Sequence, residues 1–172
     1  RKHVTIPQYL KMIKNKPAVL VAAAMKMGAI VSKTSEKEAD LIYDFGLNLG
    51  LAFQLQDDYL DAFGDPETFG KQVGGDIIEN KKTYLYLKAL EFSTDEKASE
   101  LEKLFTLQLE DNVEKIETAK AIFNQSGASK ATQEAIEMYT FKAFETLEKM
   151  EIGDEKKNVL RTFGENLMGR KV

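Results

Sequence analysis

The chain has 172 residues, a formal net charge of −4 and a hydrophobic content of 43%, which suits one domain or a large part of one. It has no cysteine and a single histidine, His3, which excludes disulfides and thiolate metal sites and argues against imidazole chemistry. Because cysteine is absent and histidine occurs once, any metal site would rest on carboxylates and favour Mg²⁺. The negative net charge argues against a nucleic-acid partner. The lack of a long apolar run argues against stable membrane insertion.

The first third of the chain contains three predicted helices. Thr5-Ile6-Pro7-Gln8 combines a capping threonine, an early proline and a glutamine, which is typical of a helix start. A second helix is expected over residues 18–31, after a break at Pro17. Ser35-Glu36-Lys37-Glu38 forms a capping box and opens a long helix that reaches about Phe63. Because this helix is apolar on most sides, we expect it in the middle of a bundle.

Helical periodicity continues after a glycine-rich loop that runs from Gly64 to Gly75. A further capping box is predicted at Ser93-Thr94-Asp95-Glu96, and Asp154 is the expected cap of the last helix. The predicted helical ranges are 76 or 80 to 92, 93 to 107, 113 to 126, 129 to 150, and 154 onward. The sequence shows no convincing strand and no internal repeat, so we predict an all-α fold.

Acidic residues form a stripe near the end of the long predicted helix. Gln54, Asp57, Asp58 and Asp61 stand at relative positions 0, 3, 4 and 7, which places them on one face at about 3.6 residues per turn. Their charges repel one another, and a bound divalent cation would reverse the sign of that interaction. A solvated helix end remains the alternative, because acidic clusters are common on helices. The spacing does not fit an EF-hand loop.

Three lysines are candidate partners of the acidic stripe. Lys71 lies within the glycine-rich loop, and Lys81 lies at the predicted start of the next helix, while Lys16 precedes the break at Pro17. Glycines let a loop close over a ligand, and lysines near carboxylates suit an anion bridged by Mg²⁺. An ordinary surface loop with solvated lysines is the alternative. The loop does not match a P-loop, because its spacing is wrong and a helix precedes it.

Two sequence strings carry a resemblance to a known family. They are LAFQLQDDYLDAFGDP at residues 51–66 and GKQVGGDIIENK at residues 70–81, preceded by YLKMIKNKPA at residues 9–18. Their order resembles the second aspartate-rich region of trans-polyprenyl diphosphate synthases of the farnesyl and geranylgeranyl type. The resemblance is sharp over residues 9–90 and looser further on.

This resemblance implies the isoprenoid-synthase fold, a helical bundle around a deep cavity, as a cytoplasmic homodimer. The family condenses an allylic diphosphate with isopentenyl diphosphate, assisted by Mg²⁺. The resemblance assigns Asp57 as a direct metal ligand, with Asp58 and Asp61 supporting it. It also implies four substrate-binding residues around the metal, which are Lys16, Gln54, Lys71 and Lys81. Among all these site residues, the resemblance counts Asp57, Lys16 and Gln54 as catalytic.

The sequence departs from the family pattern in two ways. Pro17 stands where the family usually has threonine, so a hydroxyl near the reacting carbons is missing. A first DDxxD motif is also missing from these residues. We therefore expect residues 1–172 to be the C-terminal portion of a single polyprenyl synthetase domain, and to be inactive alone.

Three other interpretations compete with the elongating enzyme. A terpene cyclase would need an additional Asn-Ser/Thr-Glu type motif, which the downstream sequence does not show. A non-catalytic subunit of a heteromeric synthase would be expected to lose the carboxylates, yet all three are present. A helical scaffold without ligand leaves the aspartates and the matched lysines unexplained.

Overall fold

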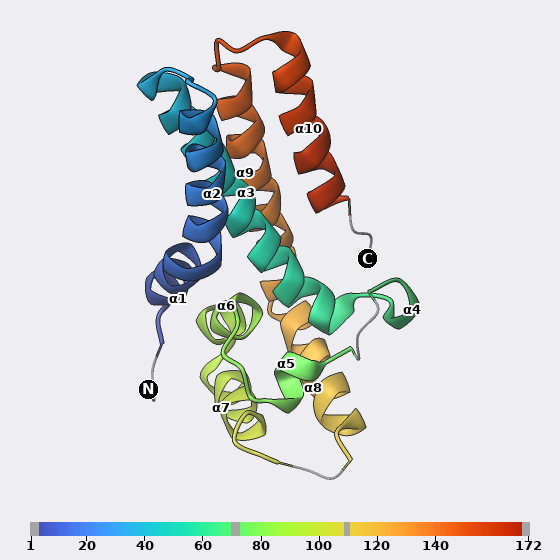
Figure 1. The fold of residues 1–172 in the computed structure, drawn as a ribbon. Helices are drawn as coiled ribbons and strands as arrows, with labels where there is room; N and C mark the ends of the chain where they lie inside the picture. The colour runs from blue at the N-terminus through green and yellow to red at the C-terminus, as the bar shows by residue number, and fades with distance from the viewer. Residues whose placement is uncertain (1–3, 70–72, 109–110, 170–172) are drawn as a thin grey trace. The chain divides into compact units, whose positions relative to one another are not determined.

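The computed structural model describes residues 4–69, 73–108 and 111–169, and within these ranges the chain is helical without a strand (Figure 1). This confirms the predicted all-α class. The helices are α1 (Ile6–Ile13), η1 (Lys14–Ala18), α2 (Val19–Val31), α3 (Glu36–Phe63), α4 (Pro66–Phe69), α5 (Gly75–Ile78), α6 (Tyr84–Phe92), α7 (Asp95–Leu104), α8 (Val113–Gln125), α9 (Ala128–Glu148) and α10 (Asp154–Met168).

The chain forms two compact units. Unit 1 contains the described residues up to Tyr9 together with Leu55–Glu134, and unit 2 contains Leu10–Gln54 together with residues 135–169. The division falls within α3 and α9, so the acidic end of α3 belongs to unit 1.

Unit 2 is built around the first part of α3. Phe45 and Leu49 of α3 are fully buried and share a core with Leu147 of α9. Glycines allow α3 to approach the preceding helices closely: a Cβ atom on Gly50 would lie 2.8 Å from the Cα of Ala18. The apolar character of α3 thus reflects its central place in this unit, as predicted.

Pro17 does not break the helical path. It lies inside the π-helical turn η1, which continues directly into α2. A proline removes one backbone donor, and a wider turn accommodates that loss without ending the helix. The predicted break is therefore wrong.

The caps of the helices are only partly as predicted. Thr5 and Gln8 form a reciprocal capping box, with each side chain accepting the other residue's backbone N–H at 3.3 and 3.1 Å. At the start of α7 the capping side chain is Thr94 rather than Ser93, and it accepts the N–H of Lys97. Asp154 is already the first residue of α10, whose capping position is occupied by Gly153 without a side-chain bond.

Unit 1 carries the glycine-rich loop and the helices that follow it. Its buried side chains include Leu60 of α3, Leu85 of α6, Leu101 of α7 and Phe123 of α8. Of the two predicted restarts, Asp76 lies at the start of the short helix α5, whereas Asn80 lies between α5 and α6 in a left-handed conformation with φ of 57°. The predicted continuous helix to Phe92 is therefore wrong, because α5 ends at Ile78 and α6 begins at Tyr84. Lys81 therefore lies in a turn and not at the start of a helix.

Candidate functional site

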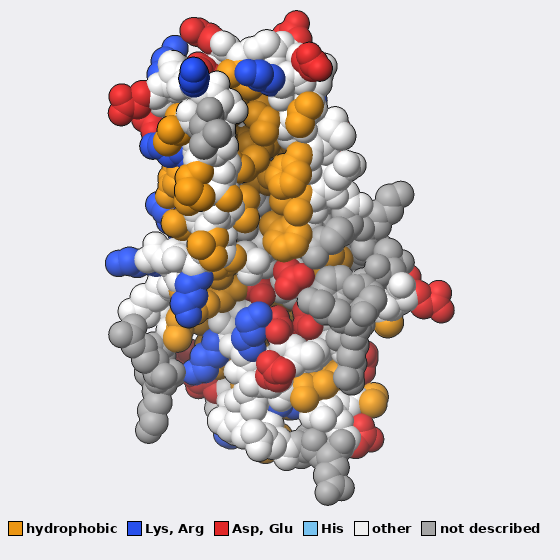
Figure 2. Space-filling view, viewed as in Figure 1, with side chains coloured by type: hydrophobic (Ala, Val, Ile, Leu, Met, Phe, Trp, Pro, Cys, Tyr) orange, Lys and Arg blue, Asp and Glu red, His pale blue; other side chains and the backbone are white. Residues whose placement is uncertain are grey.

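The acidic stripe lies at the end of α3 in unit 1. Asp57, Asp58 and Asp61 share an uninterrupted helix, so their spacing places them along one stripe. They differ in burial: Asp58 is only 4% exposed, whereas Asp57 and Asp61 are half-buried. Figure 2 shows acidic and basic side chains gathered near this end of the helix.

Asp58 is held by two partners from distant parts of the sequence. The hydroxyl of Tyr9, from α1, donates to Asp58 Oδ2, and the ammonium of Lys81 donates to Oδ1 at 3.1 Å. Burial raises the pKa of Asp58 to about 7, although the charge and hydrogen bond of Lys81 act in the opposite direction. The interior of unit 1 therefore favours a cation beside this carboxyl group.

Lys81, which lies in the turn that follows α5, bridges two aspartates. Its Nζ lies 3.0 Å from Asp76 Oδ2 as well as 3.1 Å from Asp58 Oδ1. Burial alone lowers the pKa of Lys81, but Asp58 and Asp76 raise it above its ordinary value overall. The Lys81 side chain is still 44% exposed, so the charged group can meet a ligand from solvent.

Asp61 ties the end of α3 to the loop that returns toward it. Its Oδ2 accepts the backbone N–H of Asp76 at 2.8 Å, and its carbonyl oxygen accepts the N–H of Gly74 at 2.5 Å. Gly74 has φ of 85°, a conformation that glycine adopts without strain. Burial raises the pKa of Asp61 to about 6, while the hydrogen bond from Asp76 lowers it.

The other predicted site residues have different places. Lys16 is exposed in η1 and Gln54 is half-buried on α3, and both belong to unit 2. Lys71 lies outside the described residues. Unit 1 thus brings together Asp57, Asp58 and Asp61 with Lys81, whereas the roles of Lys16, Gln54 and Lys71 stay predictions.

The donors at the end of α3 fit a hard cation in their chemistry. Carboxylate oxygens are the ligands that Mg²⁺ prefers, and burial of Asp58 and Asp61 disfavours their negative charge until a cation compensates it. Both oxygens of Asp58 already contact Tyr9 and Lys81, so this residue is placed to support a neighbouring ligand. Among the described side chains, no group of three or more is preassembled as a metal site.

Sequence reasoning missed the roles of Tyr9 and Asp76. Asp76 offered a signal, because it is an acidic residue that lies between the glycine-rich loop and Lys81 and can pair with that lysine. Tyr9 offered none, since its contact with Asp58 spans 49 residues and depends on how α1 packs in unit 1.

The sequence and the fold were compared with known proteins. Residues 1–124 match the family model described as Polyprenyl synthetase. Over 156 residues the chain is 37% identical to the short chain isoprenyl diphosphate synthase of Methanothermobacter thermautotrophicus, covering 91% of this chain and 47% of that relative.

Solved structures show the same likeness. A crystal structure of a geranylgeranyl pyrophosphate synthase matches 100% of this chain and 54% of its own, with a TM-score of 0.90 and 56% identity. The polyprenyl synthase from Caulobacter crescentus CB15, complexed with calcium and isoprenyl diphosphate, matches 99% of this chain and 52% of its own, with a TM-score of 0.86 and 32% identity. The chain therefore spans about half the length of these relatives and has the helical-bundle fold of isoprenoid synthases.

None of the described helices combines the length and apolar character that crossing a membrane requires.

Proposed function

Because the chain belongs to the polyprenyl synthetase family, we propose that it is the C-terminal portion of a trans-prenyl diphosphate synthase, with residues 1–172 forming part of one synthetase domain. Its relatives named as short chain isoprenyl diphosphate synthase and geranylgeranyl diphosphate synthase support this activity. The proposed substrates are an allylic diphosphate and isopentenyl diphosphate.

In the proposed reaction, the allylic C–O bond breaks and its electron pair leaves with the diphosphate. The double bond of isopentenyl diphosphate supplies the electrons for the new C–C bond, and the resulting carbocation loses a proton. The products are an isoprenyl diphosphate that is longer by five carbons and inorganic pyrophosphate. The protein's main task is to stabilise the leaving group electrostatically.

One observation carries this proposal: the ammonium of Lys81, at the end of a partly exposed side chain, is held between Asp58 and Asp76 beside the carboxylates at the end of α3. A fixed cation beside metal-binding carboxylates is the arrangement that a diphosphate requires. Lys81 binds a diphosphate oxygen in this scheme, and Asp76 and Asp58 keep its charge in place.

The carboxylate stripe supplies the proposed metal ligands. Asp57 would bind Mg²⁺ directly, supported by Asp58 and Asp61, and bound Mg²⁺ would neutralise charge on the leaving diphosphate. Asp57 is half-buried on α3, and Asp58 is held by Tyr9 and Lys81, which places it to support a neighbouring ligand.

Three further residues are proposed to contact the substrate. Lys16 and Lys71 would bind the allylic diphosphate together with Lys81, and Gln54 would lie beside the departing group. Pro17 follows Lys16 where the family usually has threonine, so this enzyme would work without that hydroxyl.

Assembly and location follow from the resemblance alone. We propose that the full-length protein is a cytoplasmic homodimer. Light scattering coupled to size-exclusion chromatography would report the assembly, and cell fractionation would report the location.

The activity is tested on the protein expressed from its complete reading frame. Labelled isopentenyl diphosphate, an allylic diphosphate and Mg²⁺ should give a labelled isoprenyl diphosphate, and Asp57→Asn should remove most of that activity. If product formed only with a second, different chain, and Asp57→Asn had no effect, the non-catalytic subunit would be the correct interpretation.

A further inference from the structure

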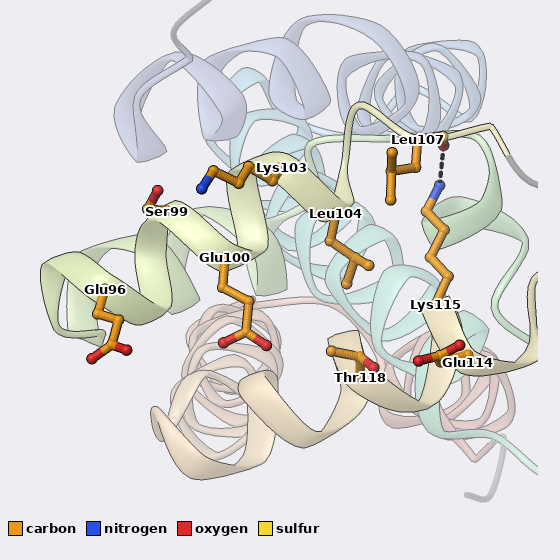
Figure 3. A pocket seen from close by; sticks show the side chains of 9 residues that line it. All are labelled: Glu96, Ser99, Glu100, Lys103, Leu104, Leu107, Glu114, Lys115 and Thr118. Atoms are coloured by element: carbon orange, nitrogen blue, oxygen red, sulfur yellow. Dashed lines mark hydrogen bonds between the residues drawn. The ribbon is translucent and has the colours of Figure 1, made fainter.

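A buried lysine of α8 has no place in the scheme above. Lys115 is only 1% exposed, and it is one of the largest fully buried side chains of the described chain. Figure 3 shows it lining a cleft of about 680 Å³ between α7 and α8, with its ammonium directed toward the connection at Leu107. Moving an ammonium out of water is costly, and burial lowers the pKa of Lys115.

The ammonium of Lys115 is bound by three neutral oxygens. It donates to Asn80 Oδ1 at 2.6 Å, to the carbonyl of Leu107 at 2.8 Å and to the carbonyl of Ile78 at 3.3 Å. The side-chain amide of Asn80 also donates to the Leu107 carbonyl at 3.2 Å. Lys115 therefore joins α8, the connection before it and the turn that follows α5.

This turn is the segment that carries Lys81. Asn80, which directly precedes Lys81, has a left-handed backbone with φ of 57°, and the N–H of Lys81 bonds to the carbonyl of Asp76 at 2.9 Å. Fixing Ile78 and Asn80 therefore fixes the point from which the Lys81 side chain leaves the backbone.

The neighbouring residue of α8 supports the other end of α5. Ile116 packs against Gly74 so closely that a Cβ atom there would lie 2.8 Å from Ile116 Cδ1. Lys115 and Ile116 thus hold the segment from both ends of α5. An apolar side chain could fill the space of Lys115 at less desolvation cost, but it could not bind these three oxygens.

We propose that Lys115 is a positioning residue, which fixes the turn over Ile78 and Asn80 and thereby places the Lys81 ammonium between Asp58 and Asp76. The link to diphosphate binding rests on the proposed function of Lys81, but the effect on the turn does not.

The first experiment measures the turn itself. Backbone amide hydrogen exchange is compared between the full-length protein and its Lys115→Met variant. We expect exchange of the amides from Ile78 to Lys81 to become at least about tenfold faster, while the amides of α9 stay protected. Lys130→Met, which alters an 81% exposed lysine of α9, is the matched control and should leave the turn unchanged.

A second variant guards against a general folding defect. Asn80→Gly removes one acceptor of Lys115 and tolerates the positive φ, so it should loosen the same amides. The double variant should add little to either single change, since both remove one shared contact. Unchanged exchange in a folded Lys115→Met protein, or fully additive effects, would overturn the proposal.

Kinetics then connect the turn to catalysis. Lys115→Met should raise the KM for the allylic diphosphate about tenfold with a smaller change in kcat, and Lys115→Arg should recover part of the loss. A wild-type protein without prenyltransferase activity would contradict the proposed function, and hydrogen exchange would still decide the role of Lys115.

Discussion

Asp58 and Lys81 show how one pair of residues organises the candidate site. The side chain of Asp58 is 4% exposed, while the side chain of Lys81 is 44% exposed. The buried member anchors the pair through Tyr9, and the exposed member remains available to a ligand. This asymmetry distinguishes the pair from a surface ion pair, in which both side chains are solvated and the net contribution to stability is small.

Asp57 is predicted to be the carboxylate whose loss is most costly to activity. Asp57→Asn removes a negative charge from the proposed metal ligands, so kcat of the full-length enzyme should fall by about 10²–10³-fold. The matched control is Asp44→Asn, which neutralises an exposed aspartate on the same helix and should leave kcat unchanged. Steady-state assays decide this, and equal losses in the two variants would contradict the assignment.

The stability of the metal-free protein is predicted to decrease as pH rises from about 4 to 7. Burial raises the pKa of Asp58 to about 7 and that of Asp61 to about 6, above the ordinary value of 3.8. The folded state therefore binds more protons than the unfolded state in this range, and the stabilisation is full below pH 4 and lost toward pH 7.

Urea unfolding at several pH values in the presence of a chelator measures this dependence. Asp58→Asn cannot ionise at that position, so its unfolding free energy should vary less between pH 4 and 7. A variant that kept the full pH dependence would show that Asp58 does not titrate in this range.

At the scale of elements, α3 has two different tasks along its length. Its first part packs closely against η1 and α2 in unit 2. Gly46 and Gly50 have no side chain there, and a Cβ atom at these positions would collide with Ala22 and Ala18, respectively. The last turns of α3 belong to unit 1 and carry the aspartates. A long uninterrupted helix keeps those aspartates in a fixed rotational order, because every residue turns the side chain by the same angle.

Gly50→Ala should destabilise the protein by about 1–3 kcal/mol, since its Cβ atom would lie 2.8 Å from the Cα of Ala18 and the backbone must shift. Gly28→Ala is the matched control within α2, where a Cβ atom meets nothing within 4 Å. It should stabilise the protein by about 0.5–1 kcal/mol through helix propensity. Urea unfolding measures the stability of both variants. An unchanged free energy of unfolding in Gly50→Ala would contradict the close packing of α3.

At the scale of the whole molecule, unit 2 exposes many apolar side chains. Leu20 and Phe141 are 71% and 70% exposed, and Val159 of α10 is 65% exposed. Figure 2 shows hydrophobic side chains gathered over and between α2 and α10. Apolar surfaces of this kind commonly mark interaction sites. The relatives matched here are about twice as long as this chain.

The chain of 172 residues by itself is predicted to give no product with both diphosphates and Mg²⁺. Its sequence contains only one DDxxD motif, so half of the proposed metal-binding set is missing. Mg²⁺ with a bisphosphonate should raise its melting midpoint only weakly, because stabilisation follows affinity for the folded state. Turnover by this chain, or a large rise of the midpoint, would contradict the prediction.

The sequence by itself determined the helical class, the family resemblance and the stripe of Asp57, Asp58 and Asp61. These follow from local information, since apolar periodicity, capping residues and i, i+4 spacing act within a few turns of one helix. The backbone conformation at individual residues between or within helices was less predictable. Pro17 continues a helix through η1, and Asn80 leaves the helical region.

Only the tertiary structure decided which partners these residues meet. The contacts of Asp58 with Tyr9 and Lys81, and of Lys115 with the turn at Asn80, join residues 23 to 49 positions apart. Such contacts depend on how helices pack around a common core, and burial then shifts the pKa values of the groups enclosed. No local pattern encodes those distances.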